Sequence, residues 1–321
     1  MKFEFKISKL ANQFFFISNL SEWHFSCRKE YNQFWLKKTG RLSKNERGAL
    51  KQFKNIQKKY KFGKIDGKTI YLGTPFIVSQ EGRIWENFKK WVNENEFKKI
   101  KEIFGILKKR FEIIWLEEGL KLKKFKKFLI REMDSEKNQR ILSYLSKFYN
   151  KKLPYGKNIN IYLFAIPKES SGIGGSALPD KKGITLEVRG LENINDYILV
   201  ILHEVAHSFL DEDSIKKIQQ IMRKYQLPSH KLIRKGGTGL IRELILCSLI
   251  PNGYLAEKYF KIPVQKPKGV KMEKSRQNMR FLEKSAVFYL YPLAKKYIDG
   301  KKVLDDNYIE KTIKIIIHIL K

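Results

Sequence analysis

The sequence predicts an α+β fold that is predominantly helical, with a small mixed β-sheet preceding one strongly apolar helix. Two observations predict this class. Over most of residues 1–150, and again from Asn195 onward, apolar residues recur three or four positions apart, a spacing typical of amphipathic helices. Between these regions lie short apolar segments bounded by glycine and proline, which indicate strands at 158–166, 172–178 and 183–188.

The helical spacing divides the chain into a series of expected helices. In the first half they are residues 30–38, 46–60, 83–122 and 137–150. Residues 61–76 contain several glycines and a proline and predict a hairpin or loop. In the second half, helices are expected at 195–210, 213–225, 239–250, 252–260, 273–299 and 305–320.

Positive charge dominates the composition. The chain has 66 Lys and Arg against 33 Asp and Glu, a net charge of +33, and 53 of the basic residues are lysine. This excess favours a lysine-coated surface, and the alternative is a polyanion partner such as nucleic acid or an anionic membrane surface. Segment 121–128, KLKKFKKF, is the best local support for a partner, although its apolar spacing also fits an amphipathic helix with a basic outer face.

Cysteine content and hydropathy limit the class of protein further. Two cysteines, Cys27 and Cys247, make no disulfide framework, and 42% hydrophobic residues suffice for a sizeable core. Polar residues interrupt the first apolar stretch, residues 7–20, so no secretory signal is expected. No window reaches the roughly 18 apolar residues of a membrane span. We therefore expect a soluble, cytoplasmic protein without a transmembrane segment.

One segment has a pattern with a specific chemistry. Val200 to Phe209 reads VILHEVAHSF and contains the H-E-x-x-H pattern at residues 203–207, which chance predicts only about 0.006 times in this composition. On a helix, residues four apart lie on one face, so His203 and His207 can direct two imidazoles at one metal ion. Glu204 follows His203 and can accept a proton from a metal-activated water. The competing interpretation is two core histidines bonded to ordinary partners.

This segment resembles the active-site helix of the zincin metallopeptidases, and strands 158–166 and 183–188 followed by helices match their order of elements. The resemblance covers roughly residues 155–260. It implies a catalytic domain at 153–321, one Zn²⁺ per chain, and a helical N-terminal region at 1–152 whose role it does not define. In such enzymes the strand before the helix is often the sheet edge along which a peptide lies, which implies substrate contacts at Glu187, Val188 and Arg189.

A catalytic zinc site needs a third protein ligand, and gluzincins take a Glu from a later helix. Residues 239–250 read as a helix that is apolar nearly all round, so the carboxylate of Glu243 there favours a cation such as zinc. The competing interpretation is that Glu243 faces the N-terminus of its own helix or an arginine such as Arg242 or Arg189. A flexible Gly-rich approach precedes it, with Thr238 as a possible N-cap. The rival is Asp213, six residues after His207, where metzincins place their ligand. Leu210 disfavours it, because that pattern needs a glycine at this position for a sharp turn.

Three other residues are candidates for roles around the predicted site. Asp211 is expected either to orient His207 or to be a solvated acid. His230 and Tyr254 are the candidates for stabilising the oxyanion, although each also fits an ordinary structural role.

The sequence thus predicts a gluzincin-like zinc metallopeptidase that hydrolyses a peptide or protein substrate with Glu204 as general base. Two alternatives stay open. The first is a metallopeptidase associated with nucleic acid, which is possible but not favoured. The second is a non-catalytic, polyanion-binding helical protein in which the histidine pattern is a structural metal site.

Overall fold

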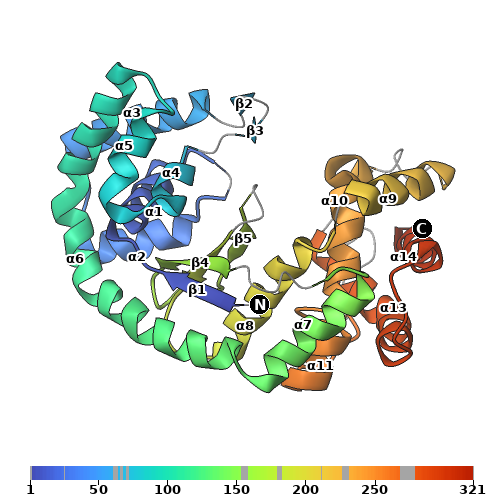
Figure 1. Ribbon diagram of the computed structural model, residues 1–321. Coiled ribbons are helices and arrows are strands. Elements are labelled where there is room, and N and C mark those ends of the chain that lie inside the picture. Colours follow the sequence, from blue (N-terminus) through green and yellow to red (C-terminus); the bar gives the residue numbers. More distant parts are fainter. Residues whose placement is uncertain are drawn as a thin grey trace. The chain divides into compact units, whose positions relative to one another are not determined.

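The computed structural model (Figure 1) describes residues 2–24, 26–60, 64–65, 68–69, 72–152, 158–178, 183–210, 212–225, 231–267 and 279–320. Two compact units are present. The first unit comprises Met1–Lys2, Arg131–Asn158 and Asn193–Lys321, and the second comprises Phe3–Ile130 and Ile159–Glu192. Both units are discontinuous along the chain, and the division of roles at residue 152 remains a prediction. The predicted α+β class is confirmed, with a small mixed sheet preceding helix α8.

The four-stranded sheet has the order β1-β4-β6-β5. Its strands are β1 (Lys2–Lys6), β4 (Asn158–Ala165), β5 (Gly175–Ala177) and β6 (Gly183–Val188). β4 and β6 are parallel, whereas β5 runs antiparallel to β6. The three strands predicted from sequence are confirmed, and β1 was not predicted.

The expectation that residues 183–188 form a sheet edge is wrong. β6 lies between β4 and β5, so its main-chain groups are already bonded on both sides. The amide of Glu187 donates to the Gly174 carbonyl, and the carbonyl of Val188 accepts from Ile166. A β-rich apolar segment can lie at an edge or inside a sheet, because both positions need the same side-chain alternation and only the strand order distinguishes them.

The second unit also contains helices around an aromatic core. They are α1 (Lys9–Ser21), α2 (Lys29–Thr39), α3 (Lys44–Lys59), α4 (Thr74–Val78), α5 (Ile84–Lys89) and α6 (Glu94–Met133), the last belonging to this unit up to Ile130. A short hairpin, β2 (Lys64–Ile65) and β3 (Lys68–Thr69), lies within the segment predicted as a hairpin or loop. α1 was not predicted, because it is buried on nearly every face and so lacks a one-sided apolar period.

The first unit is helical. It contains α7 (Glu136–Phe148), α8 (Ile194–His207), α9 (Glu212–Lys224), α10 (Lys231–Cys247), α11 (Tyr254–Phe260), α13 (Met279–Asp299) and α14 (Asp306–Leu320). These confirm the helices predicted for the second half of the chain, except that residues 273–278 of one predicted helix lie outside the described residues. α10 contacts α8, α9, α13 and α14. Among the described residues, no helix is both long and apolar enough to cross a membrane.

A buried ion pair ties three helices of the second unit together. Arg110 on α6 donates from Nε and Nη2 to the two carboxylate oxygens of Glu46, each at 2.8 Å. It also donates to the carbonyls of Thr39 and Gly40 at the end of α2. Glu46 in turn closes the capping box of α3 with Ser43. The hydrogen bonds from Arg110 hold the pKa of Glu46 at about 2.

We expect this pair to give a pH-dependent contribution to stability. A carboxylate whose pKa is lowered on folding stabilises the protein above its ordinary pKa of 4.5, and this contribution is lost as the pH falls toward about 2. Glu46→Gln leaves the buried Arg110 charge partly unpaired, so the free energy of unfolding at pH 7 should fall by roughly 3 to 5 kcal/mol. Denaturant titrations at pH 7 and pH 3 should show this deficit shrinking at the lower pH.

The matched control is Glu136→Gln on α7, whose carboxylate is 84% exposed and pairs with Arg140 at the surface. This variant should change the free energy of unfolding by less than about 0.5 kcal/mol. A deficit for Glu46→Gln that is equal at both pH values would contradict the assignment of the pH dependence to this pair.

Candidate metal centre

The H-E-x-x-H segment lies in the last turns of α8 (Ile194–His207). Its apolar residues, among them Ile201, Leu202 and Val205, are fully buried, which fixes the rotation of the helix. His203 and His207 therefore share one helix face, with their rings perpendicular and their centroids 4.8 Å apart. The side chains are 11% and 24% exposed, so both imidazoles lie mostly out of water.

α10 supplies the third member of the group. The helical run is broken at Gly237, whose φ of 53° and ψ of −148° are non-helical and suit a residue without Cβ. The stretch that follows is apolar and buried, and Glu243 is its half-buried carboxylate. One carboxylate oxygen lies 3.2 Å from Nε2 of His203 and the other lies 3.3 Å from Nε2 of His207. The structure thus brings together the three residues that the sequence predicts as ligands.

A backbone carbonyl fixes the ring of His203. Nδ1 of His203 lies 3.2 Å from the carbonyl oxygen of Ile250, just beyond the end of α10. Because a carbonyl oxygen only accepts, Nδ1 donates to Ile250, and Nε2 is the ring atom directed at the group, where it either donates to Glu243 or, once deprotonated, can bind a metal ion. A hydrogen bond of this kind to the distal nitrogen is the usual support of a metal-binding histidine.

The electrostatics of the group show strong mutual attraction. Burial raises the pKa of Glu243, but hydrogen bonds and charge from His203 and His207 outweigh it and hold that pKa well below its usual range. Burial likewise lowers the pKa of His203, and the carboxylate of Glu243 outweighs it so that the net shift is upward. The site therefore favours positive charge at the point where the three side chains meet.

The donor set fits a zinc ion. The two Nε2 atoms lie 3.1 Å apart, and all three ligand atoms fall within 4.8 Å of one another. In a tetrahedral site with bonds of 2.0–2.2 Å, neighbouring ligand atoms are separated by about 3.3–3.6 Å, close to the separations found here. Two imidazole nitrogens and one carboxylate are also a known zinc ligand set. His203, His207 and Glu243 can thus hold a metal ion, whose identity the geometry alone leaves open.

The other residues predicted for the site are not members of the His203, His207 and Glu243 group. Glu204 is half-buried on α8, and its charge contributes to raising the pKa of His203. Asp213 is 84% exposed and lies 4.0 Å from the Lys216 ammonium, apart from the group. The Tyr254 hydroxyl donates to Asp299 at 2.5 Å. Two other predicted residues, Asp211 and His230, lie outside the described residues.

The residues predicted to bind substrate belong to the second unit. The Glu187 carboxylate accepts from the Tyr31 hydroxyl at 2.8 Å and lies 3.4 Å from Arg28. Val188 is buried, and Arg189 donates to the carbonyl of Ser170 at 2.8 Å. These contacts are internal to the unit, and a role of Glu187, Val188 and Arg189 in substrate binding remains a prediction.

Two residues near the group were not predicted. Cys247 lies one turn after Glu243 on α10, and its thiol donates to a Glu243 oxygen at 3.5 Å. Burial, with the charge of Glu243, raises the pKa of this thiol well above its usual value, so it is a neutral donor. The four-residue spacing between Glu243 and Cys247 is the sequence signal that could have identified Cys247 as a neighbour of the ligand. Tyr149 is buried, and its hydroxyl has no hydrogen-bond partner in the described part of the chain. Burial is the main cause that raises the pKa of this hydroxyl, and the charge of Glu243 adds to it.

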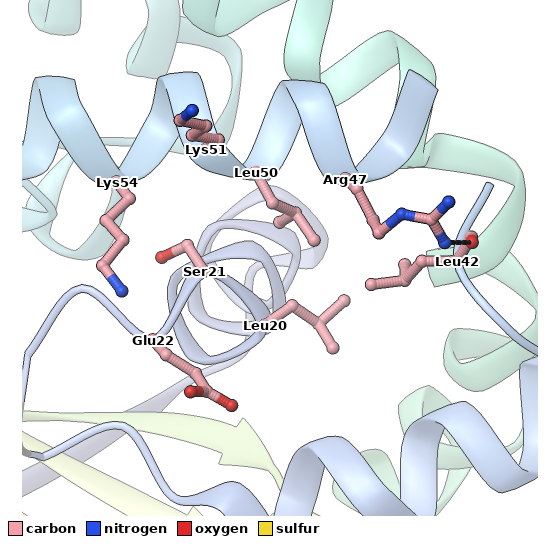
Figure 2. A pocket seen from close by; sticks show the side chains of 8 residues that line it. All are labelled: Leu20, Ser21, Glu22, Leu42, Arg47, Leu50, Lys51 and Lys54. Atoms are coloured by element: carbon pink, nitrogen blue, oxygen red, sulfur yellow. Dashed lines mark hydrogen bonds between the residues drawn. The ribbon is translucent and has the colours of Figure 1, made fainter. Parts of the chain in front are cut away.

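A separate pocket lies in the second unit, between the end of α1 and α3 (Figure 2). Its volume is about 320 Å³. It is lined by Leu20, Ser21, Glu22, Leu42, Arg47, Leu50, Lys51 and Lys54. One guanidinium nitrogen of Arg47 donates to the Leu42 carbonyl at 2.5 Å across its rim. None of the metal-site residues contributes to this pocket.

Comparison with protein-family models, curated proteins and solved structures finds no match to this chain. Fold and site therefore define the class by themselves: an α+β protein with a largely buried His/His/Glu group that can hold a metal ion.

We expect the purified protein to bind one zinc ion per chain. Zinc at a hundredfold excess over its dissociation constant should raise the free energy of unfolding by about 2.7 kcal/mol, and a chelator should reverse the effect. His207→Ala and Glu243→Ala each remove one donor and should abolish the shift. Elemental analysis gives the stoichiometry, and thermal denaturation with and without zinc gives the stabilisation.

Asp213→Ala is the control, because this carboxylate is exposed and lies apart from the group. It should bind zinc as the wild type does. Stoichiometric zinc in the double variant His203→Ala/His207→Ala would contradict the assignment of the site.

Proposed function

We propose that this protein is a gluzincin-like zinc metallopeptidase that hydrolyses peptide bonds. The observation that carries the proposal is the convergence of Glu243, from a later helix, with the two histidines of an H-E-x-x-H helix. That arrangement combines the sequence motif with the third donor that gluzincins use. A metal site of any other purpose would not need a glutamate directly after the first histidine.

The number of donors supports a catalytic site over a structural one. Structural zinc sites are closed by four protein ligands, whereas catalytic sites keep a position open beside three. Among the described residues the candidate group has three members, His203, His207 and Glu243. Cys247 is not a member of this group, and its thiol donates to a Glu243 oxygen.

The residues of the site have distinct roles in the proposed reaction. When bound, zinc polarises the scissile carbonyl and makes a nearby water more acidic. The carboxylate of Glu204 accepts the proton of the attacking water and delivers it to the nitrogen of the leaving amine. The Ile250 carbonyl holds the ring of His203, and the Cys247 thiol orients one oxygen of Glu243.

The position of Glu204 supports this role. It directly follows His203 on α8, is half-buried rather than fully exposed, and acts electrostatically on His203 and Cys247. A general base must lie close enough to the reacting water while keeping its own carboxylate ionised. We propose a peptide or protein as the substrate.

Glu204→Gln tests the mechanism. Glutamine has nearly the same shape but cannot accept the proton, so zinc content should be unchanged while hydrolysis falls by about 10²- to 10⁴-fold. The assay is cleavage of a peptide library by the zinc-loaded protein, read by mass spectrometry, with elemental analysis in parallel. Asp213→Asn is the matched control and should keep both zinc and rate.

Two outcomes would count against the proposal in different ways. Cleavage at the wild-type rate by Glu204→Gln would leave the reaction without its base. Stoichiometric zinc in the wild type with no cleavage of any library peptide would favour the non-catalytic alternative.

A further inference from the structure

Exposed apolar side chains gather on one helix of the second unit. Among the described residues, nine large apolar side chains are strongly exposed, and five of them lie on α6. These five are Ile113, Leu116, Leu120, Phe128 and Ile130. Leu116 and Leu120, at 74% and 61%, are the most exposed of the nine. α6 is the long helix drawn in teal and green in Figure 1.

Three of these residues form a stripe. Ile113, Leu116 and Leu120 are spaced three and four positions apart and therefore lie on one face of the helix. The opposite face is the one that builds the core, with Phe111, Ile114 and Leu122 almost fully buried. A small rotation of α6 about its axis would therefore not bury the stripe. The stripe stays exposed while the opposite face of the helix packs in the core.

Lysines surround the stripe on the same face. Lys109 lies on its N-terminal side, and Lys123, Lys124 and Lys127 lie on its C-terminal side; all four are exposed. Residues 108–128 contain eight basic and three acidic residues. The three acids are already paired, Glu112 with Lys9, Glu117 with Lys38 and Lys121, and Glu118 with Lys121. The four lysines of this face make no ion pair with any described residue, so their charge is available to a partner.

We propose that the outer face of α6, defined as Lys109, Ile113, Leu116, Leu120, Lys123, Lys124 and Lys127, docks onto an anionic lipid surface. An interfacial helix needs an apolar strip that enters the headgroup region and cations that reach the lipid phosphates from its sides. Lysine suits this position because its alkyl stem lies along apolar surface while its ammonium reaches the polar layer. The helix lies in the plane of the interface and does not span it.

The other partners fit this face less well. A nucleic acid would satisfy the lysines, but it would leave Leu116 and Leu120 exposed, since duplex phosphates offer no apolar surface at that position. A second copy docked through the same face would set lysines against lysines. A lipid surface matches both the apolar stripe and the charge.

Vesicle cosedimentation at physiological salt tests the proposal. The full chain should bind vesicles of phosphatidylcholine with phosphatidylglycerol and bind pure phosphatidylcholine far more weakly. Leu116→Ser/Leu120→Ser and Lys123→Gln/Lys124→Gln/Lys127→Gln should each lower the partition coefficient by at least about tenfold. All substituted side chains are exposed, so circular dichroism and the melting temperature should be unchanged.

Matched controls separate this face from general charge and hydrophobicity. Lys44→Gln/Lys51→Gln/Lys58→Gln removes the same charge from the exposed side of α3, and Leu191→Ser/Val303→Ser removes two exposed apolar side chains elsewhere. Both should bind as the wild type does. Failure of the wild type to bind anionic vesicles, or an equal loss in either control, would overturn the proposal. Tight duplex binding that is lost in the α6 lysine variant, without vesicle binding, would assign the face to nucleic acid instead.

Discussion

Three electron-pair donors meet between α8 and α10, and the first unit is organised around holding them there. Two imidazole nitrogens and a carboxylate lie within 3.1 to 3.3 Å of one another in a largely buried place. Such atoms repel unless a positive charge lies among them, and burial makes that repulsion stronger. Their convergence therefore requires either protons or a cation, and the packing of two helices to keep them in register.

The end of α10 does more than supply a ligand. Within one short buried stretch it provides the Glu243 carboxylate, the Cys247 thiol that donates to it, and the Ile250 carbonyl that accepts from His203. Because the apolar residues between them, including Leu244 and Leu249, are fully buried, these groups have little freedom to move independently. Ligand and supporting groups are thus positioned by the same hydrophobic contacts.

Much of this site could be predicted from sequence because its signals are local. The four-residue spacing of the histidines survives any tertiary arrangement, and a carboxylate in an apolar helix requires a partner wherever that helix packs. The Ile250 carbonyl could not be predicted, since every residue has a carbonyl and only tertiary packing decides which one faces a ring. Tyr149 is separated in sequence from the site and has no pattern that marks it.

The fold, like the site, was predictable from sequence where its signals are local and not where they depend on distant segments. Most helices with one apolar face and the strands bounded by turns were predicted. The expected helix at 83–122 is instead two helices, α5 and α6, and α1 was missed because burial on all sides removes its period. The strand order was beyond reach, because alternation along 183–188 is the same whether β6 is central or at an edge. Long-range pairing is a property of several segments at once, and one segment's pattern does not contain it.

The charge of the chain illustrates how structure narrows an ambiguous composition. A net charge of +33 favours any polyanion and selects none. α3 and α6 both present lysines to solvent, but the exposed residues of α3 are polar or glycine, whereas α6 adds Leu116 and Leu120. Charge alone attracts at long range and is screened by salt, while exposed leucines gain only where they leave water. The combination on α6 therefore matches the proposed surface, which is anionic outside and apolar beneath, and it distinguishes α6 from the lysine-rich exposed side of α3.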